Sequence, residues 1–163
     1  MLIFSIKLLN NLRKAIAGRR YPNQLAGGVA LGVLMGVIPH GNLLAVCVLC
    51  AVLCFRVNHA MLAAVAIAVS FGATRLDSYS HAVGEFCLTH PVGYQWAASA
   101  WQLPLVPWMN INNTVVLGSF LIGLAASPII FVVTLPFFRA IAPAEQETSA
   151  QQGKLANQQP RQT

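Results

Sequence analysis

The sequence predicts an all-α integral membrane protein. We expect a short-armed helical hairpin, or two short spans, together with two further transmembrane helices and an N-terminal amphipathic helix. Hydrophobic residues make up 56% of the 163 residues and charged residues only 9%, against about 25% charged residues in an ordinary soluble domain. Long apolar runs carry no charge, and half of the basic residues lie in the first twenty positions. So few polar groups cannot cover a surface in water, whereas lipid can cover an apolar one.

Residues 1–21 predict a basic amphipathic helix at the membrane surface. Leu8 and Leu12 fall on one helical face, and Lys7 and Lys14 fall on another. A helix packed on the rest of the protein is the alternative. Apolar residues precede the basic ones, which is the reverse of a secretory signal. The basic residues form no continuous stripe, so we expect no nucleic-acid partner.

Two short uncharged runs follow, at 24–38 and 43–55, and a helix break at residues 39–42 separates them. Each run would be roughly 20–22 Å long as a helix, against a hydrocarbon core of about 30 Å. They predict either two short spans or a re-entrant hairpin that turns inside the membrane. The shortness of both arms favours the hairpin, whose irregular turn would have to be buried in protein or face water.

A third apolar helix is predicted at 60–73, and the longest apolar run, at 114–138, is long enough to cross a bilayer with some tilt. The mixed region 77–112 contains all three tryptophans and several prolines. Because indole rings favour the membrane–water interface, we expect this region to be interfacial and on the outer side.

The chain is therefore expected to have three parts: a surface helix at 1–21, a membrane domain at 22–140 and a disordered polar tail at 141–163. Both interpretations of the two short runs give the same parity of crossings. Since basic residues favour the cytoplasmic side, we expect both termini there and a multi-pass topology.

Two strips of small residues recur at four-residue spacing: Gly28, Gly32 and Gly36, and Ser119, Gly123 and Ser127. Four-residue spacing places each strip on one helix face, where small side chains let another backbone approach closely. We expect the strips to dock on each other or on a second copy, and a glycine-lined pore wall is the alternative. The expected partners are the lipid bilayer and either a second copy or another membrane protein.

The candidate polar residues are Pro39, His40, Gly41 and Asn42 at the helix break and Asn112 and Asn113 before the last span. If the break lies inside the membrane, His40 is an intramembrane ionisable group and hence a functional candidate. If the break lies at the outer surface, His40 is an ordinary loop residue. Asn113 is expected to cap the last helix, with a substrate-binding polar cluster as the alternative. Arg75 and Asp77 are expected to pair, and binding of lipid headgroups is the alternative.

Enzyme, metal and cofactor signatures are absent from the sequence. Cys47, Cys50 and Cys54 share a helix face, but no His or carboxylate nearby completes a metal site, so we expect them to pack as small apolar residues. The chain has no nucleophile elbow, zinc-protease motif or phosphate-binding loop. Asp77 and Glu85 are the carboxylates outside the tail, so we expect no enzyme, no metal and no cofactor.

Residues 22–32 and 36–42 resemble an uncharacterised bacterial family of small inner-membrane proteins that carry a domain of unknown function. Residues 112–119 resemble the Asn-Asn-Thr signature of one proteobacterial subgroup. Many relatives carry Asn-Pro near the end of the third apolar helix, where this chain has Phe-Gly-Ala-Thr at 71–74. No role is carried over from that position. The resemblance implies a bacterial inner membrane and no particular activity.

We therefore expect a non-enzymatic inner-membrane protein that scaffolds or anchors an envelope complex. The small-residue strips, the outer aromatic region and the lack of catalytic groups favour this function. The alternative is a small transporter or channel-like protein, with a polar path at residues 39–42 and with Asn112 and Asn113 on its outer side.

Overall fold

A computed structural model describes residues 21–141 of the chain, and these residues are helical with no strand among them. The helices are α2 (Pro22–Val37), α3 (Leu43–Leu53), α4 (His59–Ala73), η1 (Thr74–Leu76), α5 (Asp77–Thr89), α6 (Pro91–Trp101), η2 (Val106–Met109) and α7 (Thr114–Ile141). The all-α class is thereby confirmed. The expected surface helix and polar tail lie outside the described residues, apart from Tyr21 and Ile141.

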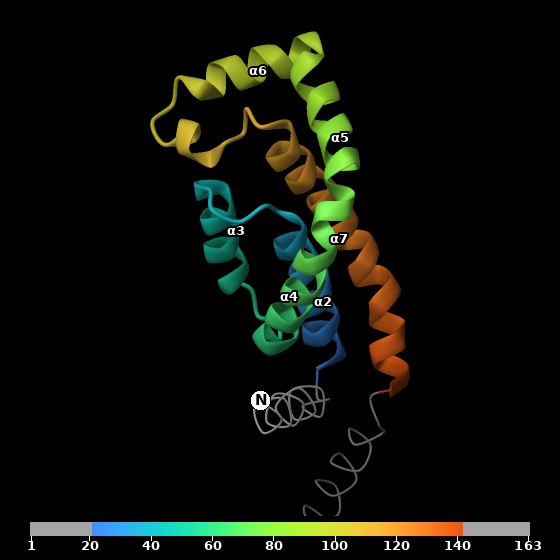
Figure 1. Cartoon of the computed structure of the whole chain (residues 1–163). Coiled ribbons are helices and arrows are strands. Elements are labelled where there is room, and N and C mark those ends of the chain that lie inside the picture. The colour runs from blue at the N-terminus through green and yellow to red at the C-terminus, as the bar shows by residue number, and fades with distance from the viewer. Residues whose placement is uncertain (1–20, 142–163) are drawn as a thin grey trace, which may run out of the picture.

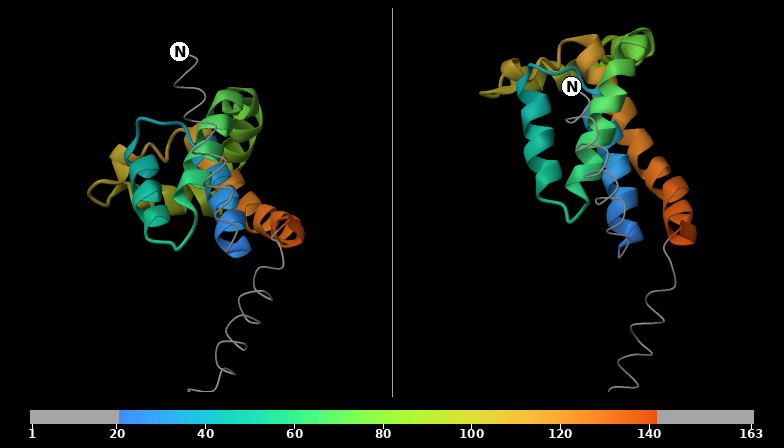
Figure 2. Two further views of the ribbon diagram at one scale, coloured as in Figure 1. Left: turned by 90° about the horizontal axis from the view of Figure 1, so that it is seen from below. Right: turned by 60° about the horizontal axis from the view of Figure 1, so that its bottom comes forward.

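The chain runs back and forth along one long axis (Figure 1). Helix α2 rises and α3 returns, then α4, η1 and α5 rise together to the far end, where α6 crosses and α7 descends. Helix α2 lies between α4 and α7 and packs mainly against these two, while α5 packs against the first turns of α7 (Figure 2). We call residues 90–113, which contain α6 and η2, the cap.

Side-chain caps and prolines set the ends of the helices. Pro22 occupies the first turn of α2, where its missing N–H costs nothing. The Asn58 side chain caps α4 by accepting from Met61 N at 3.0 Å. At the other end of α2, Ile38 is extended and Pro39 has no N–H to continue the helix.

The third apolar helix does not stop where its sequence turns polar. Helices α4 and α5 form one helical stretch, His59–Thr89, through the single 3-10 turn η1. Thr74, Arg75 and Asp77 interrupt the hydrophobic pattern, but none of them breaks a helical backbone. The first part of the expected interfacial region is therefore the helix α5.

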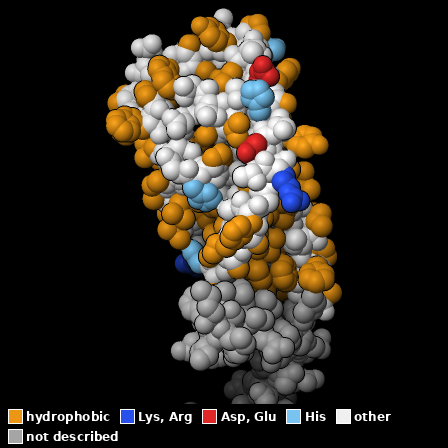
Figure 3. All heavy atoms as spheres, in the orientation of Figure 1, with side chains coloured by type: hydrophobic (Ala, Val, Ile, Leu, Met, Phe, Trp, Pro, Cys, Tyr) orange, Lys and Arg blue, Asp and Glu red, His pale blue; other side chains and the backbone are white. Residues whose placement is uncertain are grey.

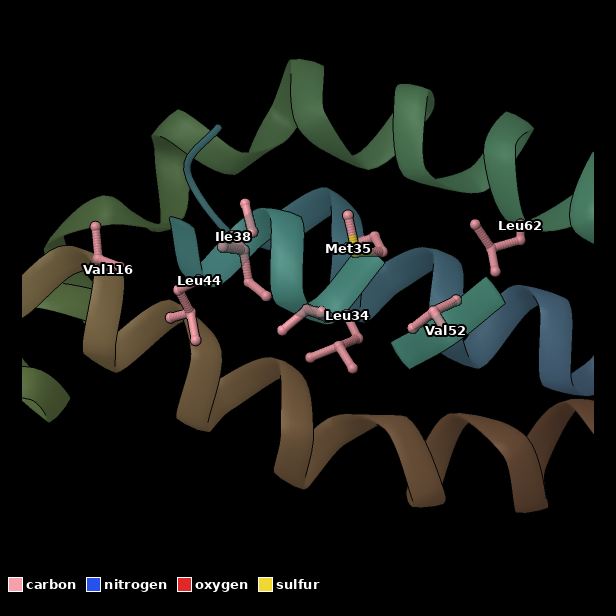
Figure 4. Packing of buried hydrophobic residues seen from close by; sticks show 9 residues of the cluster. Leu34, Met35, Ile38, Leu44, Val52, Leu62 and Val116 are labelled. Carbon is pink, nitrogen blue, oxygen red and sulfur yellow. The ribbon is translucent and has the colours of Figure 1, made fainter. Parts of the chain in front are cut away.

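The core surrounds the C-terminal half of α2 (Figure 4). Its buried members come from α2, α3, α4 and α7 and include Leu34, Met35, Ile38, Leu44, Val52, Leu62 and Val116. Ile38, just beyond the end of α2, is only 1% exposed. Burying apolar side chains at about 25 cal/mol per Å² holds the end of α2 in place.

Two helical stretches are long and apolar enough to cross a membrane, His59–Thr89 and Thr114–Ala140, by length and composition. Helices α2 and α3 are apolar but shorter. On the face drawn in Figure 3, hydrophobic side chains spread over the whole length and charged ones are few.

Candidate functional site

The glycine strip of α2 lies against α4. A Cβ built on Gly28, Gly32 or Gly36 would come within 2.7–2.8 Å of a carbonyl oxygen of α4 or of its N-cap. The three oxygens belong to residues spaced four apart, Asn58, Leu62 and Ala66. The strip is thus used inside the chain, against α4 and not against the strip of α7.

The three residues of the α7 strip have different roles. A Cβ on Gly123 would meet Leu34 of α2 at 2.9 Å, and Ser119 is 1% exposed. Ser127 instead donates from Oγ to the carbonyl oxygen of Leu124 at 3.0 Å. That oxygen has no helical N–H donor because the residue four positions on is Pro128. Ser127 therefore satisfies a proline-freed carbonyl.

A second close helix contact, between α5 and α7, was not anticipated. A Cβ on Gly84 would overlap the carbonyl of Thr114, and one on Gly118 would overlap that of Ser80. Beside them, His81 Nδ1 lies 2.6 Å from Thr114 Oγ1. The signal was available as two small-residue pairs at four-residue spacing. It was missed because residues 77–112 were expected to form an outer interfacial region.

A recess of about 370 Å³ opens where α2 ends, and we call it the break recess. Three segments meet there: the end of α2 with the helix break, the α4–η1–α5 junction, and the first turn of α7. Its polar lining residues are His40, Ser70, Thr74, Asp77 and Asn113. Its apolar lining includes Val37, Ile38, Val115 and Val116. The structure thus brings His40 and Asn113, two predicted candidates, together with Asp77.

Gly41 and Asn42 build the turn and do not line the recess. Asn42 is 7% exposed; its Nδ2 donates to the Pro39 carbonyl at 2.7 Å and its Oδ1 accepts from Ala45 N at 2.8 Å. The amide therefore caps α3 and fixes the turn. Gly41 has a φ of 99°, a backbone conformation that favours glycine.

Asn112 and Asn113 lie in different places. Asn113 Oδ1 accepts from Val115 N at 2.9 Å and from Val116 N at 3.3 Å, as expected of a helix cap. Asn112 instead lines a second cavity of about 470 Å³ between the cap and the end of α5, whose lining includes Tyr94 and Trp101. The two asparagines do not share one polar path.

The expected Arg75–Asp77 pair does not form. Between residues 21 and 141 the ion pair is His81 Nε2 with Glu85, at 3.6 Å. Over the same residues no group of three or more His, Cys, Asp or Glu could hold a metal ion. Cys47 and Cys50 of α3 and Cys54 at its C-cap are exposed and free. They do not pack in the interior of the described residues, as was expected of them.

The register of α2 on α4 fixes the level of the break recess along the bundle. The two helices run in parallel from the Asn58 N–Gln24 O hydrogen bond, 3.0 Å, to the Ser70 Oγ–Gly36 O hydrogen bond, 3.3 Å. The helix break therefore lies beside the place where the apolar sequence of α4 ends at Thr74. The break is also level with the first turn of α7, which is one end of the membrane-length stretch Thr114–Ala140.

The fold and the recess define an all-helical bundle with two membrane-length apolar helices and a polar recess at the end of a third. Residues 8–146 match the model of a family described as "uncharacterized protein conserved in bacteria (DUF2062)", and the chain belongs to that family. The predicted resemblance to an uncharacterised bacterial family is confirmed, while its Asn-Asn-Thr subgroup stays a prediction. No curated protein and no solved structure matches the chain.

Proposed function

We propose that the chain is a non-enzymatic integral protein of the bacterial inner membrane that anchors an envelope complex through its cap. The observation that carries this proposal is the apolar outer surface of the long helices. Large side chains on α4 and α7 face outward with little cover, among them Ile67, Phe71, Ile129, Val132 and Phe137, and Phe71 is 85% exposed. Contiguous apolar surface of this extent is unfavourable in water and marks contact with lipid or protein.

The arrangement of the chain supports a topology with both termini in the cytoplasm. The start of α2, the α3–α4 connection and the end of α7 lie at one end of the bundle, and α6 crosses the other end (Figures 1 and 2). The α3–α4 connection contains Arg56, and the last turn of α7 contains Arg139. Basic residues at one end of apolar helices favour that end as the cytoplasmic one.

The cap is the surface we assign to a partner. From residue 86 to residue 138 the sequence contains no Asp, Glu, Lys or Arg. The aromatic side chains of the cap are exposed, notably Tyr94, Trp96 and Trp108. Interfaces are enriched in aromatic residues and depleted of charge at their centres, so an uncharged aromatic cap suits an envelope membrane protein or the cap of a second copy.

Transport through the helix break receives less support. The glycine contacts leave no space for a polar path between α2 and α4, and Leu34 fills the contact between α2 and α7. Asn42, a candidate for the polar path, is buried and bonded within its own turn. The polar residues gather instead in a recess at the end of α2.

Photo-cross-linking in intact cells tests the anchor. A photoreactive amino acid at Trp108 of the cap is compared with one at Val132 on the outer face of α7, both in the full chain. We expect a protein adduct of defined mass from position 108 and mainly lipid adducts from position 132. Lipid adducts alone from both positions would contradict the assignment of a protein partner to the cap. Extraction of the membranes with alkaline carbonate tests the membrane assignment itself, which release of the chain into the soluble fraction would contradict.

A further inference from the structure

We propose that the break recess binds an organic ammonium group, with the Asp77 carboxylate as its counter-charge. The inference does not depend on the anchor function, because it concerns the recess at the end of α2 and not the exposed aromatic side chains of the cap. It is carried by the charge of Asp77 and by the size and lining of the recess.

Asp77 supplies the charge. Its carboxylate is the one acidic group among the residues that line the recess, and no Lys or Arg lines it. Within residues 21–141 this carboxylate has no hydrogen bond and no ion pair, since the described ion pair joins His81 to Glu85. Arg75 is two positions away in η1 but does not line the recess. An unpaired carboxylate in a partly enclosed site favours a cationic ligand.

The helix ends around the recess do not cancel this charge. Helix α2 ends there, and its last carbonyls lack helical donors because Ile38 is extended and Pro39 has no N–H. A helix C-terminus carries about half a negative charge, and the N-terminus of α7 carries about half a positive charge. Asn113 already bonds two N–H groups of α7. The two half-charges offset one another, and the full charge of Asp77 remains.

The size and lining of the recess suit a small organic cation better than a bare metal ion. Its volume of about 370 Å³ falls in the range of about 300–1,000 Å³ that small-molecule sites occupy. Val37 and Val116 offer apolar contact for methylene or methyl groups. The Ser70 hydroxyl has one proton, which it directs to the Ala66 carbonyl at 2.7 Å and, at the longer distance of 3.3 Å, to the Gly36 carbonyl. Its oxygen lone pairs are left to accept from an ammonium N–H.

The ammonium group could come from a free amine or from a lipid headgroup. The recess lies beside the end of the apolar sequence of α4, which is the level at which headgroups would meet the proposed membrane protein. Ethanolamine and phosphatidylethanolamine share the chemistry that the recess would recognise, namely an alkylammonium with N–H donors. The two sources are separated experimentally.

The test uses the purified full chain in nanodiscs of phosphatidylglycerol, which has no amine. Ethanolamine is titrated in one series and phosphatidylethanolamine is added to the discs in another, with potassium chloride as the control cation. Thermal unfolding reports binding, because a ligand that binds the folded state raises the melting temperature. We expect a saturable rise with ethanolamine or with phosphatidylethanolamine and none with equimolar potassium. A rise with the lipid alone identifies a headgroup.

Two variants and one control locate the site. Asp77→Asn should weaken binding by about tenfold or more, because the amide oxygen can still accept a hydrogen bond but the negative counter-charge is lost. Ala73→Phe should also weaken binding, since it fills the recess and leaves the charge in place. Glu85→Gln, an acid on α5 outside the recess, should bind as the wild type does. Circular dichroism checks that each variant is helical, and Ala73→Phe serves if Asp77→Asn does not fold.

Absence of a rise with either amine would overturn the inference. The inference would also be overturned if both Asp77→Asn and Ala73→Phe bound the amine as the wild type does, or if Glu85→Gln lost as much binding as they do. An equal rise of the melting temperature with potassium would overturn it as well. None of these outcomes bears on cross-linking at the cap, so the failure of one proposal is distinguishable from the failure of the other.

Discussion

Gly32 of α2 lies so close to Leu62 of α4 that a Cβ on the glycine would stand 2.8 Å from the leucine carbonyl oxygen. The same relationship recurs one turn below, at Gly28, and one turn above, at Gly36. Three such contacts fix the register of two parallel helices, and close Cα–H···O approaches contribute at interfaces of this kind. Because the register is fixed, α4 determines the level at which α2 ends and the break recess opens.

Gly32→Ala should destabilise the protein. Alanine improves helix propensity by about 1 kcal/mol, but the added methyl meets backbone and must push α2 from α4, at a cost of about 1–3 kcal/mol. We expect a net loss of about 1 kcal/mol, and a larger one for Gly32→Val. Unfolding in mixed micelles with increasing dodecyl sulfate measures the change.

Gly72→Ala is the matched control for that substitution, since Gly72 is also helical and its Cβ would meet nothing within 4 Å. It should be neutral or stabilising by up to about 1 kcal/mol. Equal losses at positions 32 and 72 would show that the α2–α4 contact is looser than described.

Asn42→Ala should reduce stability without affecting ligand binding at the recess. The substitution removes the cap of α3 and the bond to the Pro39 carbonyl, which together contribute about 1–2 kcal/mol. Asn112→Ala is the control, because that side chain is exposed, and surface changes are usually within about 0.5 kcal/mol. A loss of amine binding in Asn42→Ala with unchanged stability would place Asn42 in the ligand site and refute its structural role.

Ser127 and Pro128 should be energetically coupled. In the native chain Ser127→Ala leaves the Leu124 carbonyl without its donor, at a cost of about 1 kcal/mol. In a Pro128→Ala background the restored N–H takes over that carbonyl, so the same serine substitution should cost almost nothing. A double-mutant cycle measures the coupling, and additive effects would mean that the hydroxyl does not serve the proline-freed carbonyl.

Leu105→Asn should stabilise the cap. Leu105 precedes η2 with a φ of 74°, a left-handed conformation that costs most L-residues about 1–2 kcal/mol and that asparagine tolerates better. Leu103→Asn is the control, because Leu103 is 58% exposed against 63% for Leu105 and has no positive φ. We expect a gain of up to about 1 kcal/mol at 105 and none at 103. Equal changes in stability at positions 105 and 103 would argue against backbone strain at Leu105.

The sequence allowed the helical class and most helix positions to be predicted, because apolar runs and the proline at the break are local signals. The extent of the third helix could not be predicted, because Thr74, Arg75 and Asp77 change the polarity of the chain but not its helical backbone conformation. Because these polar residues were interpreted as the end of the helix, α5 was not predicted. The small-residue contacts of Gly84 and Gly118 were not predicted either.

The break recess was accessible only in part from the sequence. His40 and Asn113 stood out because each lies next to an apolar run. Their meeting with Asp77 depends on how α2, α4 and α7 align, and no spacing along the chain encodes that alignment. Asn42 was a candidate for the same reason as His40, yet both polar atoms of its amide form hydrogen bonds within the turn. A residue type at a break cannot distinguish a side chain that builds the turn from one that lines the site.

The most direct test of the account is the side of the membrane on which the helix break lies. Single cysteines replace His40 or Arg56 in a chain whose four native cysteines are changed to serine or alanine, and intact spheroplasts are treated with a membrane-impermeant maleimide. The account predicts that position 40 is labelled in intact spheroplasts and that position 56 is labelled only after permeabilisation. Labelling of position 40 only after permeabilisation, together with position 56, would contradict it.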